Sequence, residues 1–204
     1  MVTQRRPRGR PLSFDREAAL EQAMMLFWRH GYEATSVADL VAVMGITPPS
    51  LYAAFGDKQK LFLEAAELYL ARQQEALDQV LDQAPSARQA IAELLRNVAV
   101  TLAQPDLPCG CMLVTAALSG STASLEVQAT LSTYRRSNQE TIAAFLQRAV
   151  LQGELGSATD TKALASFFIT VIRGMSVQVQ DGATLDDLLA TGDAAMAAWP
   201  GGLP

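Results

Sequence analysis

A pair of cysteines, Cys109-Gly110-Cys111, is the part of the chain best suited to covalent chemistry. The pair follows Pro108 at the expected start of a helix, and a helix N-terminus stabilises a thiolate and lowers the pKa of a cysteine. A disulfide between two cysteines so close would be strained. The pattern therefore leaves two interpretations open. Cys109 and Cys111 are a redox sensor that reacts with other thiols or with electrophiles, or Cys111 is a small buried side chain at a helix junction.

An arginine-rich start is the second chemical feature. The first ten residues, MVTQRRPRGR, carry four arginines and no acid, and residues 1–60 have a net charge of +2 whereas residues 61–204 have −7. The segment from Pro7 to Pro11 matches the core of an AT-hook, in which Gly9 lies on the groove floor while Arg8 and Arg10 meet the negative potential of a narrow minor groove. The alternative is a flexible basic tail that is attracted to DNA without sequence preference.

Residues for catalysis are otherwise missing from the sequence. His30 is the only histidine, and its place beside Gly31 at the end of a helix favours a capping role. No glycine-rich phosphate loop, metal-ligand cluster or nucleophile elbow is present, so we expect no enzyme activity, no metal and no cofactor. Two cysteines and no apolar run near the ~18 residues of a membrane span predict a cytoplasmic protein with no membrane partner.

Helical periodicity and capping residues predict an all-α fold of about nine helices. The segments that we expect to be helical are about 15–30, 36–45, 47–56, 57–82, 86–104, 109–120, 123–152, 160–180 and 184–199. The expected organisation is a basic flexible arm at 1–12, a DNA-binding domain at 13–58 and a larger domain at 59–204. Within the DNA-binding domain three short helices, the last two joined by a tight turn at Gly45-Ile46-Thr47, form the pattern of a helix-turn-helix.

The segment TSVADLVAVMGITPPSLYAAFGDKQKLF, residues 35–62, resembles the signature of the TetR/AcrR family of bacterial regulators. The resemblance implies a cytoplasmic homodimer that binds pseudo-palindromic double-stranded operator DNA, most often as a repressor, and that a small molecule releases. It also implies DNA-contact roles. The start of the second helix and two further positions would hold phosphate (Thr35, Ser36, Tyr52, Lys58), and the start of the recognition helix would reach base edges (Thr47, Pro48, Pro49, Ser50). Ala53 and Ala54 stand where relatives often place larger side chains, which leaves more of the readout to phosphate contacts and DNA shape.

The resemblance also assigns functions to the acidic remainder of the chain. Its last two helices would form a four-helix bundle across a two-fold axis, with Ala163, Phe167, Val171 and Gly174 as candidate dimer residues. Its middle helices would enclose an effector pocket. Candidate walls, equally suited to the core, are Met112, Thr115, Tyr134, Phe145, Phe168 and Met175. These apolar walls lean toward a hydrophobic or aromatic effector. An architectural DNA-binding protein without effector is the remaining alternative.

Overall fold

The computed structural model describes residues 14–114 and 125–201, and every regular element in these two segments is a helix. The helices are α1 (Arg16–Ala34), α2 (Val37–Met44), α3 (Pro48–Phe55), α4 (Lys58–Gln83), α5 (Ala87–Leu102), α7 (Leu125–Leu151), α8 (Thr161–Gln178) and α9 (Leu185–Met196). The all-α prediction is confirmed. Residues 112–114 are helical, and most of the helix expected at 109–120 lies outside the described residues, as do Arg8, Arg10 and Thr115.

Side-chain caps set the starts of the helices where the sequence predicted them. The Ser36 hydroxyl accepts a hydrogen bond from the N–H of Asp39, and the Asp39 carboxylate accepts one from the N–H of Ser36, which closes a capping box at α2. Thr184 and Asp187 form the same box at α9. Each box pairs backbone N–H groups that the first turn of a helix leaves unbonded.

Gly31 interrupts α1 near its end. Its backbone has φ 77° and ψ 173°, so the regular helix breaks there before one more turn reaches Ala34. Glycine occupies this region without the Cβ clash that other residues meet. The predicted stop at Gly31 is thus a kink inside a longer element.

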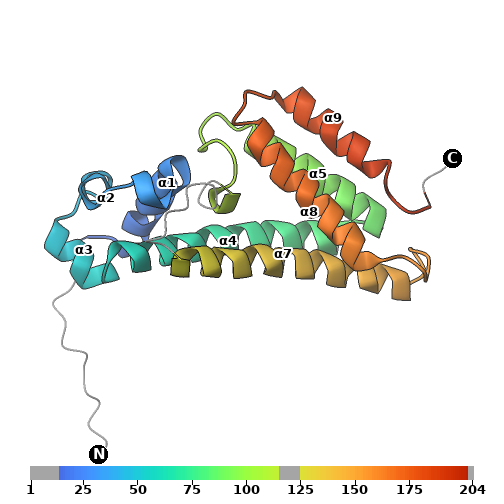
Figure 1. Cartoon of the computed structure of the whole chain (residues 1–204), viewed down its shortest axis with the longest axis horizontal. Helices are drawn as coiled ribbons and strands as arrows, with labels where there is room; N and C mark the ends of the chain where they lie inside the picture. Colours follow the sequence, from blue (N-terminus) through green and yellow to red (C-terminus); the bar gives the residue numbers. More distant parts are fainter. Residues whose placement is uncertain (1–13, 115–124, 202–204) are drawn as a thin grey trace, which may run out of the picture.

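The long helix α4 connects two groups of helices (Figure 1). Helices α1, α2 and α3 form a head at one end of α4, and α7 lies alongside α4 for much of its length. Helices α5, α8 and α9 cross above the other end of this pair and complete the body. At 1.5 Å per residue, the 26 residues of α4 make a rod of about 39 Å.

Two clusters of buried apolar side chains form most of the core. The first is centred in the head around Phe27, Leu40, Leu51 and Phe62, but it also takes in residues of the body. The second joins the far end of α4 to α5, α7, α8 and α9 around Ile91, Leu146 and Phe168. Burial of this apolar surface is the main force that holds the head and the helices of the body in place.

No single helix in the described segments is long and apolar enough to cross a membrane. Helices α2 and α3 reach that length only when they are taken together, and they meet at 92°.

Candidate nucleic-acid interface and internal cavity

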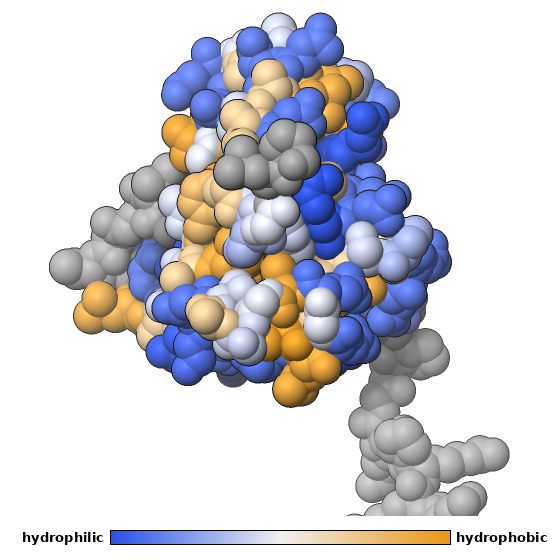
Figure 2. Space-filling model, turned by 90° about the vertical axis from the view of Figure 1, so that its right-hand side faces the viewer, coloured by the Kyte–Doolittle hydropathy of each residue, from blue (hydrophilic) through white to orange (hydrophobic). Residues whose placement is uncertain are grey.

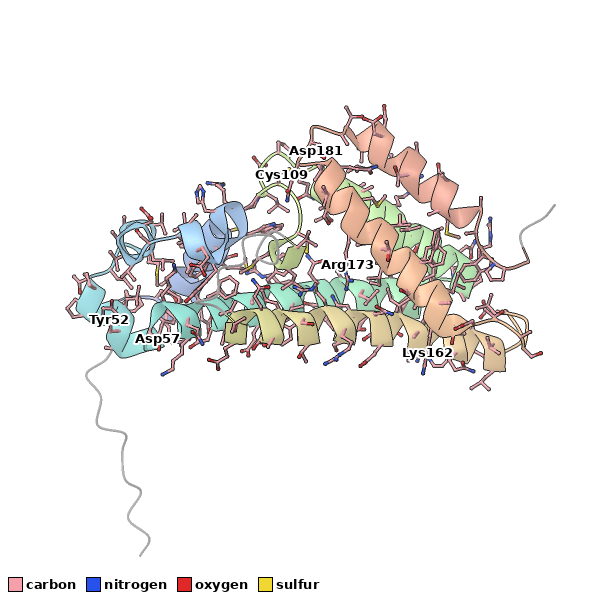
Figure 3. All side chains as sticks on the ribbon, viewed as in Figure 1. Tyr52, Asp57, Cys109, Lys162, Arg173 and Asp181 are labelled. Carbon is pink, nitrogen blue, oxygen red and sulfur yellow. The ribbon has the colours of Figure 1, made fainter. Side chains whose placement is uncertain are left out.

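Helix α3 presents an exposed N-terminus at the tip of the head. Thr47 caps the helix and Pro48 occupies its first position, where a missing N–H costs nothing. Pro48 and Pro49 are exposed, and the Tyr52 side chain is 51% exposed. Figure 3 shows Tyr52 at the head end of the molecule and Lys162 near the opposite end. This surface combines apolar rings, hydroxyl groups and a helix N-terminus, which attracts anions.

The hydroxyl groups of Thr47 and Ser50 lie 2.9 Å apart. Thr47 Oγ1 also accepts a long hydrogen bond of 3.4 Å from the Ser50 N–H. Each hydroxyl keeps further donor or acceptor capacity. The two hydroxyl groups therefore form a small polar surface beside the two prolines. The turn at Gly45 sets the angle between α2 and α3.

Thr35 corrects one prediction. Its side chain is buried, with 1% exposed, and Oγ1 donates a hydrogen bond of 2.7 Å to the carbonyl oxygen of Gly31. The hydroxyl thus bonds the backbone at the kink of α1 and cannot reach a phosphate. Ser36, the next residue, is exposed at the start of α2 and keeps its predicted place on the surface.

Lys58 is half-buried at the start of α4, and its Nζ lies 4.5 Å from the centroid of the Tyr32 ring. The cation over the ring face gains a cation–π attraction and is held near the turn that follows α3. Burial lowers the pKa of Lys58, and the charge of Glu33 acts in the opposite direction. The fold therefore positions the ammonium group, because contact with the Tyr32 ring restricts the conformations of the Lys58 side chain.

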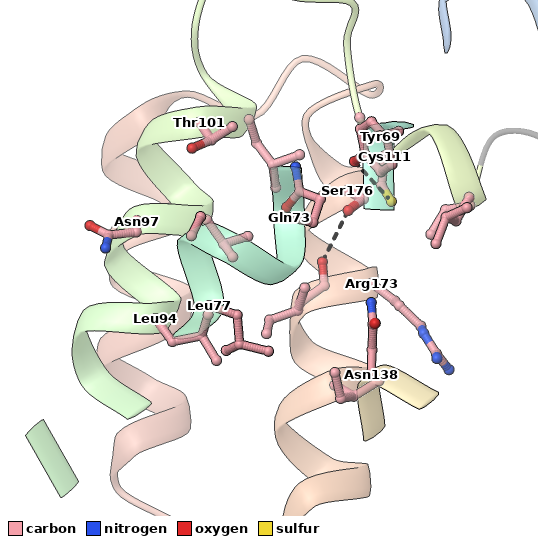
Figure 4. Close-up of a pocket in the computed structure, with 18 of the residues that line it drawn as sticks. Tyr69, Gln73, Leu77, Leu94, Asn97, Thr101, Cys111, Asn138, Arg173 and Ser176 are labelled. Carbon is pink, nitrogen blue, oxygen red and sulfur yellow. Dashed lines mark hydrogen bonds between the residues drawn. The ribbon is translucent and has the colours of Figure 1, made fainter. Parts of the chain in front are cut away.

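A cavity of about 150 Å³ lies in the body between α4, α5, α7 and α8. Figure 4 shows Gln73, Leu94, Asn138, Arg173 and Ser176 placed around it on these four helices. Further apolar residues from the same helices, Leu77, Val80, Val98, Ile169 and Ile172, complete much of the wall. Its remaining wall includes Trp28, Gly110 and Cys111. The cavity therefore borders both the head and the loop after α5 that carries the two cysteines.

Among the described residues, none of those predicted to form the pocket lines this cavity. Met112, Phe168 and Met175 are fully buried in the apolar clusters, because large apolar side chains contribute most when they pack in the core. Tyr134 and Phe145 border two other pockets of the body. The polar lining residues, above all Arg135 and Arg173, were not predicted from the sequence. The sequence contained one indication of them, because each of two helices that were expected to lie in the body carries a cationic side chain.

Cys111 is half-buried and lines the cavity, whereas Cys109 is exposed. The Tyr69 hydroxyl donates a hydrogen bond of 3.4 Å to Cys111 Sγ. Burial raises the pKa of Tyr69 well above its usual value, with Cys111 adding to the shift. Both cysteines are free, and of the two only Cys111 lines the cavity.

Three of the four candidate dimer residues are exposed on α8, namely Ala163, Phe167 and Gly174. The Phe167 side chain is 39% exposed, and a Cβ on Gly174 would meet nothing within 4 Å. Val171 is half-buried and packs against two of the apolar clusters. It therefore contributes mainly to the core of its own chain. In Figure 2, apolar side chains form an interrupted band at the body end of the molecule.

Comparison with known proteins finds matches over both parts of the chain. Residues 19–65 match the model for bacterial regulatory proteins of the tetR family, and residues 85–187 match the tetracyclin repressor-like C-terminal domain. The HTH-type transcriptional repressor ComR of Escherichia coli (strain K12) is 36% identical over 199 residues, which cover 96% of this chain and 94% of that protein. The HTH-type transcriptional repressor BdcR of the same strain is 31% identical over 199 residues, with 97% of this chain and 95% of that protein covered.

A similar solved structure is a cysteine mutant of the TetR family transcriptional regulator CifR, in complex with a 26 bp double-strand operator DNA. It is 43% identical to this chain, has a TM-score of 0.90 and covers 94% of this chain and 100% of that chain.

Proposed function

Since the chain belongs to the tetR family of bacterial regulatory proteins, we propose that it is a sequence-specific DNA-binding repressor that a small molecule releases from its operator. The observation that carries the proposal is the exposed N-terminus of α3 with Tyr52 beside it. A relative with a TM-score of 0.90 is described in complex with operator DNA.

In this proposal α3 enters the major groove, whose width of about 12 Å admits one helix. Thr47, Pro48, Pro49 and Ser50 lie at the end of the helix that meets base edges and thymine methyl groups. Ser36, Tyr52 and Lys58 contact the phosphates on either side and fix the register of the helix. The basic arm with Arg8 and Arg10 adds a minor-groove contact to this set.

We further propose a homodimer formed through α8 and α9. Phe167 and Val177 expose apolar surface along α8, and an exposed apolar face of this kind is typical of a subunit interface. A two-fold dimer places two copies of α3 about one turn of DNA apart, which requires a pseudo-palindromic operator.

The cavity is the proposed effector site. Its wall includes Trp28 of the head and several residues of α4, the helix that carries the head. An effector that prefers the DNA-incompetent arrangement by about 100-fold would weaken operator binding by up to ~2.7 kcal/mol.

Selection of bound fragments from random DNA tests the DNA-binding proposal. We expect wild-type protein to enrich a pseudo-palindrome, and Tyr52→Phe to bind it about tenfold more weakly, which corresponds to ~1.4 kcal/mol for the two phosphate contacts that a dimer would lose. Tyr134→Phe is the matched control, because its hydroxyl bonds Glu67 on the body. Deletion of residues 1–12 should remove any flanking A·T preference. Failure to enrich any sequence would support the architectural alternative in place of the repressor.

A second candidate function is thiol sensing through Cys111. Its place at the cavity wall beside the Tyr69 hydroxyl favours it over Cys109. N-ethylmaleimide would form an S–C bond with Sγ, and the thiol proton would end on the neighbouring carbon of the maleimide. We expect this reagent to release operator DNA from wild type and from Cys109→Ser but not from Cys111→Ser. Equal release from all three proteins would exclude Cys111 as the sensor.

A further inference from the structure

We propose that the effector is a small organic anion, a carboxylate on an apolar body, whose head is held by Arg135 and Arg173 in the cavity. This inference rests on the proposed effector function of the cavity and narrows the chemistry of the ligand. It adds an anionic head to the hydrophobic or aromatic effector that the sequence suggested.

The charges around the cavity are all of one sign. Among the described residues that line it, Arg135 and Arg173 are the charged side chains, and no aspartate, glutamate or lysine is present. The ion pairs of the described residues lie elsewhere and join Arg16 to Glu64, Lys60 to Asp57 and Arg72 to Glu21. Residues 115–124 contain no acidic side chain that could serve as a partner. A pair of half-buried cations without a carboxylate, in a body whose net charge is −7, is a site for an anion from outside the chain.

The two guanidinium groups are held in place by backbone carbonyls. Arg173 Nη2 donates a hydrogen bond of 2.9 Å to the carbonyl oxygen of Arg135, and Arg135 Nη1 donates one of 3.2 Å to that of Leu113. A guanidinium has five N–H donors in a fixed plane, so most donors remain for a carboxylate, which it can bind in bidentate fashion. Burial lowers the pKa of Arg135, and the positive charge of Arg173 lowers it further. A bound anion would offset this repulsion.

The rest of the lining fits an amphipathic acid. Gln73 and Asn138 add amide groups to the lining, while Leu77, Leu94 and Ile172 belong to the apolar wall. The volume of about 150 Å³ equals that of an engineered apolar cavity that binds benzene, at ~150 Å³. A phenyl ring or a short alkyl chain therefore suits the apolar part.

Calorimetric titration of the full-length protein tests the proposal by comparing each acid with its uncharged amide, and one of the acids with a cation of similar size. The probes are phenylacetate, phenylacetamide and 2-phenylethylammonium, together with benzoate, hexanoate and octanoate and their amides. We expect at least one acid to bind at least tenfold more tightly than its amide, and the ammonium compound to show no binding. Operator release, measured by fluorescence anisotropy of labelled DNA, should follow the same order.

Substitutions then assign the binding to the two arginines. Arg135→Gln and Arg173→Gln should each weaken binding of the acid at least tenfold without changing binding of the amide. Arg173→Lys should retain part of the affinity, because it keeps the charge but not the planar fork. Arg136→Gln is the matched control, because Arg136 is exposed and does not line the cavity. Circular dichroism and the thermal midpoint identify a variant that fails to fold.

Two results would overturn the inference. One is an amide that binds as tightly as its acid, and the other is intact operator binding with no acid of the panel bound. A protein that binds no operator would instead contradict the proposed repressor function, so the two failures are distinguishable.

Discussion

The indole N–H of Trp28 donates a hydrogen bond of 2.9 Å to the carbonyl oxygen of Gly110. Trp28 belongs to α1 of the head, and Gly110 lies between the two cysteines in the loop after α5. The Trp28 ring also packs edge-on against Tyr69 of α4, with ring centroids 4.9 Å apart. This buried bond thus joins the head directly to the wall of the cavity.

Removal of this bond should destabilise the protein. Trp28→Phe keeps an aromatic ring but leaves the buried Gly110 carbonyl unpaired, and we expect a loss of about 1–3 kcal/mol in the free energy of unfolding. Urea denaturation followed by circular dichroism measures it. Trp199→Phe is the control, because that buried ring packs against Phe168 in the second cluster. Equal losses in the two variants would mean that ring size, and not the hydrogen bond, accounts for the effect.

Gly110 should tolerate alanine less well than other glycines with the same backbone angle. Its φ is +82°, and a Cβ would lie 3.0 Å from the backbone oxygen of Ser176 and would collide with the Gln180 amide. Gly153 has φ +79° and open space around it. The left-handed backbone alone costs about 1–2 kcal/mol, so we expect that loss for Gly153→Ala and a larger one for Gly110→Ala. Urea denaturation compares the two, and equal losses would contradict the predicted clash.

Lys58 should contribute to the salt dependence of operator binding. Each phosphate contact adds about 0.9 to the slope of log K against log salt concentration, so Lys58→Gln should lower the slope by about 1.8 for a dimer with two such contacts. Lys162→Gln, exposed on α8 at the other end of the molecule, should leave it unchanged. Anisotropy titrations between low and moderate salt give both slopes. An unchanged slope for Lys58→Gln would place this lysine away from phosphate.

Acid should weaken the capping box of α2. Hydrogen bonds from the Ser36 hydroxyl and backbone N–H lower the pKa of Asp39. A carboxyl whose pKa is lower in the folded state stabilises the protein above its unfolded pKa of about 3.9, and the contribution is lost as pH falls through the lower folded value. In Asp39→Asn the free energy of unfolding should therefore depend less on pH in this acidic range. Urea denaturation at a series of pH values measures this dependence. If Asp39→Asn shows the same dependence of the free energy of unfolding on pH as the wild type, the predicted contribution of the capping box is contradicted.

Local sequence signals predicted the helices well because caps act within a few residues. Ser36 with Asp39, Thr47 with Pro48, and Thr184 with Asp187 all start helices where expected. The all-α fold and the helix-turn-helix could therefore be predicted from the sequence alone.

The cavity could not be predicted in the same way, because its wall combines residues from four helices that are distant in sequence. Size and apolarity favoured Phe168 and Met175, but these properties place a residue in the core as readily as in a pocket. Thr35 is another example, since its motif position does not reveal that its hydroxyl bonds the carbonyl of Gly31. Which way a side chain points depends on tertiary packing that periodicity does not encode.

The first apolar cluster continues from the head into the body. It includes Phe27 and Leu40 of the head together with Tyr69, Met112 and Leu131. Neither part can lose its packing without exposing apolar surface of the other, so their unfolding is thermodynamically coupled. The head and the body should accordingly melt together in one calorimetric transition. A segment cut after Lys58 would lack part of the core on which the fold of the head depends.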